Sequence, residues 1–406
     1  MNDILVVGAG PAGLLAAWTA RRHAARVRLV ASGIGTTHIS PGWIGVLDLD
    51  GDLSSALGSW IEAHPEHPYA LAGLSALVGG LRELQEVTAA AGLDYVGDLR
   101  SNYLLPTALG ATIRAAVVPR SFVAGNLRDP GAILIAGPAG WRDFFPGLCA
   151  GNLVRQGFSA HATTFDLPEL HAGKFDATPL TLARLFDQED VRERVAAQLK
   201  PRLDGAARVG FPAVLGLAPG ADAGGDLSER LGVPVFEIPT LPPSVPGIRL
   251  FAAFKAALTK AGVPLLLDMT AERGVVEGRQ ARGVVIPGPA RDATYKSDAI
   301  ILATGGLYGG GITTDRTGAM REAVFDLPLD KPGGLDSWFG PEFLGTHAAH
   351  HAGVRVNRDL QPLDEAGSAV LENVRIAGRL LAGHDAEAEG STEGVWLATG
   401  YRAGCI

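Results

Sequence analysis

The chain has 406 residues, of which 47% are hydrophobic and 19% charged, and its formal net charge is −8. This length can bury a large core and divide into two domains. The acidic balance, without a basic block, argues against nucleic acid as the main partner. The two cysteines, Cys149 and Cys405, cannot by themselves ligate an iron–sulfur cluster or build a disulfide framework.

The N-terminus leads directly into an apolar strand and lacks the basic start of a signal peptide. No stretch reaches the ~18 uninterrupted apolar residues that indicate a membrane span. The sequence therefore predicts a cytoplasmic protein, and any contact with a membrane is expected to come through a partner.

The first thirty residues read as strand, glycine turn, helix and strand. Ile4 to Val7 form a short apolar run of the kind buried on both faces of a parallel sheet. Leu14 to His23 form an alanine-rich helix, and a second strand follows in "VRLVAS". The pattern predicts one βαβ unit.

A long middle region, residues 63–243, carries mixed helical and loop signals. Leucines at helical spacing predict a helix within 73–93. The stretch "PTLPPSVPG" (239–247) holds too much proline for a helix or a central strand. It is interpreted either as a crossing between domains or as a rigid surface turn.

The strand signals resume after residue 247. An amphipathic helix in "IRLFAAFKAALTKAG" ends at Gly262 and is followed by a strand, a small antiparallel meander and the apolar strand of "AIILATGG". "NVRIAGRLLAG" predicts one more strand, and "EGSTEGVWLATGYRAG" opens a last helix.

The glycine turn has the spacing of a phosphate-binding loop. Gly8 permits a tight turn, Gly10 leaves room for a phosphate beside the backbone, and Gly13 lets the helix approach the strand. The N-terminus of the helix adds unpaired N–H groups and a partial positive charge. This turn predicts a cofactor that carries a phosphate.

Two later turns narrow the cofactor to a flavin. Thr304 and Gly305 close the "AIILATGG" strand, where flavoproteins pass the chain beside the cofactor. Gly383 and Asp385 end the "NVRIAGRLLAG" strand, where flavoproteins place a carboxylate on the ribityl chain. Further residues expected at the cofactor are Ser32, at the end of the second strand, and Gly390, before the last helix.

The sequence resembles the B subunit of anaerobic glycerol-3-phosphate dehydrogenase almost from end to end. The resemblance is carried by "THISPGWIGVLDL", "LLPTALGATIRAAVVP", "GWRDFFPGLCAGNL", "GFPAVLG", "LSERLGVPVFEIPTLPPSVPGIRL", "IILATGGLYGGGI", "GVRVNRDLQP" and "NVRIAGRLLAGHDAEAEG". It implies a flavin-binding subunit that works with a larger FAD-containing catalytic subunit. An iron–sulfur subunit would anchor the complex at the inner membrane. The implied reaction turns glycerol 3-phosphate and quinone into dihydroxyacetone phosphate and quinol.

The sequence departs from a dinucleotide site at Ser32, where an Asp or Glu would hold the ribose of adenosine. FMN has no adenosine, and the resemblance also implies FMN, so FMN is favoured and FAD remains possible. Glu393 departs from the family's glycine-rich stretch. A carboxylate in the first turn of the last helix would use the helix dipole itself and repel a reduced flavin.

Candidates for catalysis are few. His38, just past the second strand, is a candidate base, and Arg316 and Arg321 are candidates for holding a substrate phosphate. The "HAAHH" cluster holds His347, His350 and His351. No acidic ligand lies at a matching spacing, so no metal site is expected.

Together these signals predict an α/β fold: a Rossmann-like flavin-binding domain of the two-dinucleotide flavoprotein type, with a small β-meander and an inserted second domain. The flavin-binding domain is expected from residues 1–62, 244–310 and 353–406, the inserted or cap domain from 63–243, and a cap-side excursion from 311–352. Two alternatives remain open: a flavin-free structural partner of a catalytic flavoprotein subunit, and a stand-alone FAD-dependent oxidoreductase.

Overall fold

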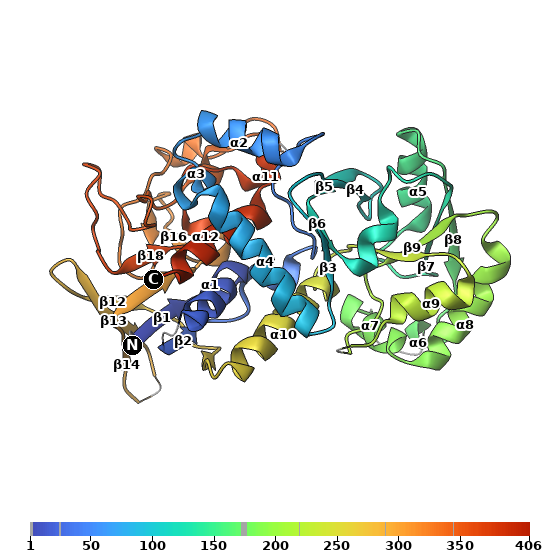
Figure 1. Cartoon of the computed structure of the whole chain (residues 1–406), viewed down its shortest axis with the longest axis horizontal. Coiled ribbons are helices and arrows are strands. Elements are labelled where there is room, and N and C mark those ends of the chain that lie inside the picture. The colour runs from blue at the N-terminus through green and yellow to red at the C-terminus, as the bar shows by residue number, and fades with distance from the viewer. Residues whose placement is uncertain (1–2, 24–25, 172–176, 219, 289, 344) are drawn as a thin grey trace.

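The computed structural model describes residues 3–23, 26–171, 177–218, 220–288, 290–343 and 345–406. Its first sheet has five parallel strands in the order β11-β2-β1-β15-β18. These strands are β1 (Asp3–Val7), β2 (Arg26–Val30), β11 (Leu265–Leu266), β15 (Ala299–Leu302) and β18 (Val374–Ile376). The sheet thus joins segments from both ends of the chain (Figure 1).

The central strands of this sheet are buried because helices and a meander cover them. Every residue of β15 is buried, as are the last four of β1. The helix α1 (Pro11–Arg22) packs against α12 (Thr392–Gly404) and α10 (Val245–Lys260). The antiparallel meander contacts β15 through its middle strand, and its strands are β12 (Arg273–Glu277), β13 (Gln280–Ile286) and β14 (Ala293–Lys296).

A second parallel sheet, in the order β10-β9-β7-β8, has its own hydrophobic core. Its strands are β7 (Ile133–Pro138), β8 (Ala160–Phe165), β9 (Arg208–Pro212) and β10 (Val235–Ile238). The helices around it are α5 (Pro146–Arg155), α6 (Pro168–His171), α7 (Pro179–Phe186), α8 (Glu189–Leu199) and α9 (Ala223–Leu231). On the right of Figure 1, this sheet and its helices form a separate lobe.

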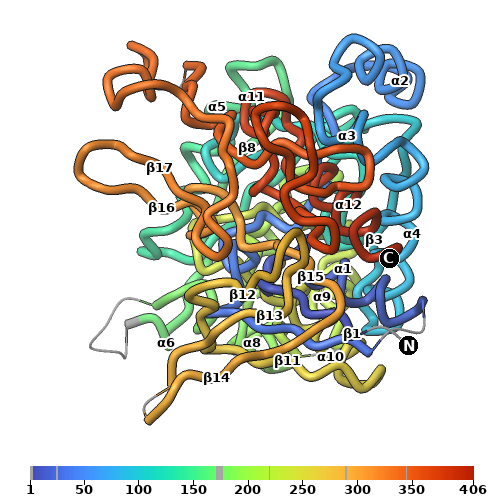
Figure 2. The backbone as a smooth tube through the Cα atoms, turned by 90° about the vertical axis from the view of Figure 1, so that its left-hand side faces the viewer, coloured from blue at the N-terminus to red at the C-terminus, as the bar shows by residue number. Residues whose placement is uncertain are grey.

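Short elements surround the two sheets. The helices α2 (Leu53–Ala63) and α3 (Pro68–Ala72) precede α4 (Leu74–Ala90), and α11 (Ala386–Glu389) precedes α12. Paired short strands are β3 (Tyr95–Gly97) with β6 (Val117–Pro119), β4 (Tyr103–Pro106) with β5 (Thr112–Ala115), and β16 (Ile312–Thr314) with β17 (Met320–Glu322). In Figure 2 the β16–β17 hairpin extends from the body at the left.

The helix α4 packs into the core of the first sheet, although the expected inserted domain begins at residue 63. Its buried face, which includes Leu77, Leu84 and Val87, belongs to the same cluster as β1 and α12. The helices come close at Gly80, where a Cβ would lie 2.5 Å from the carbonyl oxygen of Leu397. By packing, the separate lobe therefore begins well after residue 63.

The proline-rich segment 239–247 runs from β10 of the second sheet to α10, which packs on the first. The peptide bond between Pro242 and Pro243 is cis. The helix α10 begins at Val245, earlier than the stretch read as helical, because Pro246 stands in the first turn, where no backbone N–H is needed. Ser244 caps the helix by accepting the N–H of Gly247 at 3.0 Å.

We expect Gly80→Ala to destabilise the fold by about 1–3 kcal/mol, because the added methyl group meets a backbone carbonyl that cannot easily move. Gly151→Ala, in the exposed face of α5 with nothing within 4 Å of the added Cβ, is the matched control. It should gain about 0.5–1 kcal/mol from helix propensity. Urea denaturation of both variants measures the difference, and an equal gain at both positions would contradict this packing.

Candidate functional site

A cavity of about 930 Å³ opens at the carboxyl ends of β1, β2 and β15, the edge at which open α/β sheets bind ligands. Segments from across the chain line it: the turn after β1, the residues after β2, the segment just before the meander, the turn after β15, and the first turn of α12. Residues Thr112–Arg114 of β5 also line the cavity. The cavity therefore lies between the sheet edge and the chain that leads to the second lobe.

The glycine turn before α1 has the geometry of a phosphate cradle. Gly8 has φ +113°, and a Cβ there would lie 2.2 Å from the carbonyl oxygen of Ala303. A Cβ on Gly13 would lie 2.0 Å from the carbonyl oxygen of Gly8, so both glycines are required by close backbone packing. Gly10 differs, because nothing lies within 4 Å of its Cβ position and it lines the cavity.

The N-terminus of α1 is free to receive an anion. Its N-cap residue, Gly10, offers no side-chain cap, and the first turn holds no acidic residue. The N–H groups of this turn therefore receive no side-chain cap, and Gly10 and Ala12 line the cavity. These features fit a phosphate-bearing cofactor, which would rest on the turn from Gly8 to Gly13.

The turn after β15 forms a second wall of the cavity. Thr304 and Gly305 both line it, and Gly305 takes a left-handed conformation with φ +78°. The hydroxyl of Thr304 is buried and has no hydrogen-bond partner within the described ranges of the chain. A buried hydroxyl without a partner is costly, so a polar group of a cofactor would satisfy it.

Most of the expected cofactor residues reach this cavity, but not all. The lining includes Gly8, Gly10, Ser32, Thr304, Gly305 and Gly390. Gly13 serves the packing of α1, and Gly383 is an exposed turn residue with φ +83°. Asp385 is buried outside the lining and caps α11, where it accepts the N–H of Ala388 at 3.2 Å. The contact of Asp385 with a ribityl chain therefore stays a prediction that the cavity geometry does not support.

Glu393 stands in the first turn of α12, in the wall of the cavity. Its carboxylate accepts the backbone N–H of Gly45 at 3.1 Å, and the residue is 8% exposed. Burial raises its pKa from the ordinary 4.5 to about 7, although the hydrogen bond from Gly45 acts in the opposite direction. At neutral pH this end of the cavity therefore holds a carboxyl group that is only partly ionised.

Two arginines that were not predicted from the sequence line the cavity. Arg114 contacts Asp48 at 2.9 Å and Asp50 at 2.6 Å. Arg379 binds both carboxylate oxygens of Glu387, at 2.9 and 3.0 Å. No motif marks either arginine, because the approach of β5 to the sheet edge brings Arg114 there only in the folded chain.

The three catalytic candidates lie outside the cavity lining. His38 is exposed, and its Nδ1 lies 2.7 Å from the carbonyl oxygen of Gly35. Arg316 is exposed on the β16–β17 hairpin, and Arg321 pairs with Asp326 at 2.9 Å. Their assignment as base and phosphate-holding groups stays a prediction, and the geometry gives it no support.

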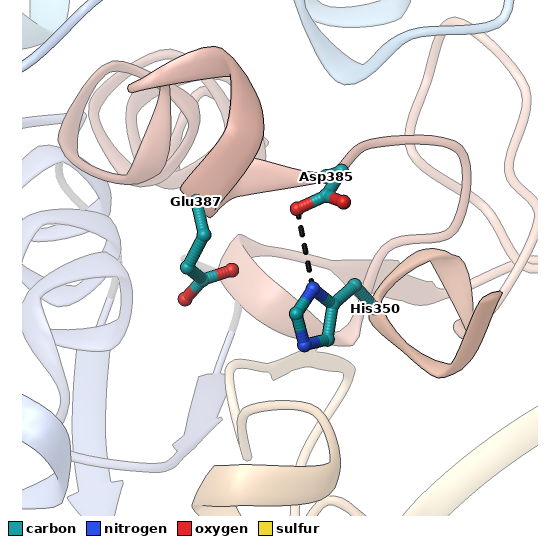
Figure 3. A group of neighbouring side chains, drawn as sticks. All are labelled: His350, Asp385 and Glu387. Carbon is teal, nitrogen blue, oxygen red and sulfur yellow. Dashed lines mark ion pairs between the residues drawn. The ribbon is translucent and has the colours of Figure 1, made fainter. Parts of the chain in front are cut away.

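The "HAAHH" cluster meets acidic residues that lie far from it in the sequence. Ligand atoms of His350, Asp385 and Glu387 lie within 4.8 Å of one another (Figure 3). Spacing along the chain could not reveal this group, because its acids come from the turn at the start of α11, some thirty-five residues after the histidine. Glu387, however, is already bound by Arg379.

The class of the protein follows from a family comparison that covers nearly the whole chain. Residues 3–394 match the model of the FAD binding domain family, to which the chain therefore belongs. This match confirms the expected Rossmann-like flavin-binding fold and a flavin as the cofactor. The chain is a flavin-dependent oxidoreductase subunit.

Curated relatives identify the narrower family. A Halobacterium salinarum protein, named as a probable B subunit of anaerobic glycerol-3-phosphate dehydrogenase, is 33% identical over 99% of this chain and 97% of its own length. The Pectobacterium carotovorum protein named as the B subunit of the same enzyme is 27% identical over 97% of this chain and 96% of its own. The chain thus belongs to this B-subunit family, as the resemblance predicted.

Solved structures resemble the chain more distantly. The open conformation of a flavocytochrome c3 fumarate reductase aligns with 99% of this chain and 77% of its own, at a TM-score of 0.45 and 12% identity. Among the described residues, no helix has the length and apolar character needed to cross a membrane.

We expect Gly10→Val to expel the flavin while the protein stays folded. Gly10 has φ −70°, which valine adopts readily, and its side chain would extend into the space left for the phosphate. Gly151→Val, at an open position outside the cavity, is the control. Flavin absorbance per chain, compared with the circular dichroism of each variant, measures the effect. Unchanged flavin content in a folded Gly10→Val protein would overturn the placement of the phosphate.

We expect Glu393→Gln to stabilise the protein increasingly as pH rises. Because the pKa of Glu393 is raised in the folded state, that carboxyl favours folding below about pH 4.5, and this contribution is lost as pH rises through 7. The variant should exceed the wild type by about 3 kcal/mol at pH 8 and by little at pH 4.5. Urea denaturation across this range gives the comparison, with Glu62→Gln at an exposed site outside the cavity lining as the control. Parallel curves for the wild type and Glu393→Gln would contradict the burial of the charge.

Proposed function

We propose that this chain is the flavin-binding subunit of a membrane-associated complex that oxidises glycerol 3-phosphate to dihydroxyacetone phosphate and passes the electrons to quinone. The observation that carries the proposal is the glycine turn, whose central residue, Gly10, opens into the cavity beneath an uncapped helix N-terminus. The names of the relatives supply the substrate.

The flavin would supply the hydride acceptor, and the protein supplies its placement. The turn from Gly8 to Gly13 would hold the phosphate, and the buried hydroxyl of Thr304 would form a hydrogen bond with the cofactor. Burial raises the pKa of Glu393, at the N-terminus of α12, to about 7, and its ionised form would add negative charge to the cavity wall. Loss of the proton from Glu393 would therefore make a reduced, anionic flavin less favourable.

Electrons are proposed to leave through partner subunits. Cys149 is buried, Cys405 is half-buried, and both are free thiols, so they provide no cluster ligand set. The relatives are named as B subunits, which supports a complex with further subunits. We propose a larger FAD-containing catalytic subunit and an iron–sulfur subunit that anchors the assembly at the inner membrane.

The flavin itself has two candidates. Ser32 in place of an acid favours FMN, as the sequence predicts. FAD is the second candidate, because the cavity continues past Ala31 and Ser32 to Met269–Glu272, along the side where adenosine would lie. Glu272 is an acid at that side. Mass spectrometry of the flavin released from purified protein separates the two.

The cations available to a substrate phosphate at the cavity wall are Arg114 and Arg379. Arg316 and Arg321 lie outside the lining. Both wall arginines are already paired with carboxylates. Binding a phosphate would therefore require these ion pairs to open or to be shared. This arrangement supports only modest affinity for an anionic substrate.

We expect the isolated chain to show no useful oxidation of glycerol 3-phosphate with a soluble quinone, because the proposed route of the electrons to quinone runs through the partner subunits. The same chain co-purified with its larger flavoprotein subunit should be active. An artificial acceptor, tested separately on the single chain, shows whether substrate is oxidised on it. Robust turnover of the single chain with quinone would overturn the dependence on partners.

A further inference from the structure

Three side chains from separate segments form a line of polar groups that starts at the cavity wall. Tyr308 lies in the turn directly after β15, lines the cavity and is 67% exposed. Its hydroxyl oxygen lies 3.1 Å from Nε2 of His350, which is carried by the short turn Ala348–His351. Tyr308 therefore borders the space that a ligand in the cavity would occupy.

The other side of the imidazole faces a carboxylate. Nδ1 of His350 lies 3.4 Å from Oδ1 of Asp385 (Figure 3). Nδ1 is buried and makes no hydrogen bond to any part of the chain that the structure describes. Asp385 is 4% exposed, and its role as the N-cap of α11 holds the carboxylate in place. The imidazole thus lies between the phenol and the carboxylate, with its hydrogen-bond contact on the side of the phenol.

These contacts define the direction in which a proton can move. If Tyr308 donates its hydroxyl hydrogen to Nε2, the neutral imidazole carries its own hydrogen on Nδ1, toward Asp385. A nucleophile, a histidine and an orienting carboxylate are ordered in the same way in acid–base sites. The guanidinium of Arg379 lies 5.7 Å from the ring centre of Tyr308 and helps hold the ring in place.

Metal binding is the alternative function of this group of side chains. His350, Asp385 and Glu387 could offer one ligand atom each. Glu387, however, is bound on both oxygens by Arg379, and Asp385 accepts a backbone N–H. A cation would have to displace Arg379. The polar contacts therefore favour proton transfer over metal binding.

We propose that Tyr308, His350 and Asp385 form a proton relay that accepts the hydroxyl proton of the secondary alcohol oxidised in this cavity. This inference rests on the proposed function, and it further places the oxidation of the alcohol on this chain rather than on the larger subunit. Tyr308 would be the catalytic residue, His350 would act through it, and Asp385 would be a positioning residue.

Atoms and electrons balance in this step. A flavin bound in the cavity would supply the acceptor for the hydride of the carbinol C–H bond, while the O–H proton passes to Oη of Tyr308. The proton of Tyr308 passes to Nε2 of His350, and the carbon–oxygen bond becomes a carbonyl. The product is a ketone, and the new positive charge on His350 faces the carboxylate of Asp385.

The tautomer of His350 tests the geometry without flavin or substrate. Nitrogen-15 NMR of the full chain, labelled at histidine and freed of flavin, identifies His350 by the signal that His350→Gln removes. The relay requires neutral His350 to be protonated at Nδ1, and Asp385→Asn should shift it toward the Nε2-protonated form. Protonation at Nε2 in the wild type would overturn the relay. So would zinc bound stoichiometrically to purified wild type and lost in His350→Gln.

Kinetics on the co-purified complex tests the chemical role. Tyr308→Phe keeps the ring and removes the hydroxyl, and it should lower kcat about 100-fold or more with little change in KM. His350→Gln should do the same. His351→Gln is the matched control, because His351 is exposed and its Nε2 lies 3.9 Å from Asp385 without a contact to Tyr308. Unchanged kcat in Tyr308→Phe would overturn the relay.

The two experiments separate failure of the relay from failure of the proposed function. If the wild-type complex does not oxidise glycerol 3-phosphate, the proposed function and the alcohol step fail together, whichever tautomer His350 adopts. If the complex is active but His350 carries its proton on Nε2, the relay alone fails.

Discussion

The structure depends on one close approach of three backbone segments at the edge of the first sheet. A side chain on Gly8 would meet Ala303 at the end of β15, and a side chain on Gly13 would meet Gly8 itself. The segments β1, β15 and the start of α1 therefore meet so closely that neither glycine position has room for a Cβ. This contact sets the N-terminus of α1 against the sheet edge, and the cavity follows from that placement.

The same contact explains why distant parts of the chain share one site. The turn after β15 can line the cavity only because β15 lies beside β1, and β18 pairs with β15 on its other side. The last helix then places Glu393 and Gly390 at the cavity wall. The second lobe has its own core, and β5, on the chain leading to it, contributes Arg114 to the cavity lining.

The sequence predicted those features that depend on local spacing. The glycine turn and the Thr304–Gly305 turn are short motifs beside apolar strands, so their positions in the cavity could be foreseen. Glu393 was also recognised from its place in a helix's first turn. Arg114, Arg379 and the partners of His350 could not be found this way, because long-range folding alone brings them together. The packing of α4 depends likewise on its fit against α12, which its own periodicity does not reveal.

The central claim is that this cavity holds one flavin. The most direct measurement is the flavin content of the purified full chain, by visible absorption and by mass of the released cofactor, after incubation with FMN and FAD and removal of excess. About one flavin per chain, of either kind, is the predicted result. A folded chain that retains none would contradict the claim and favour a flavin-free structural partner.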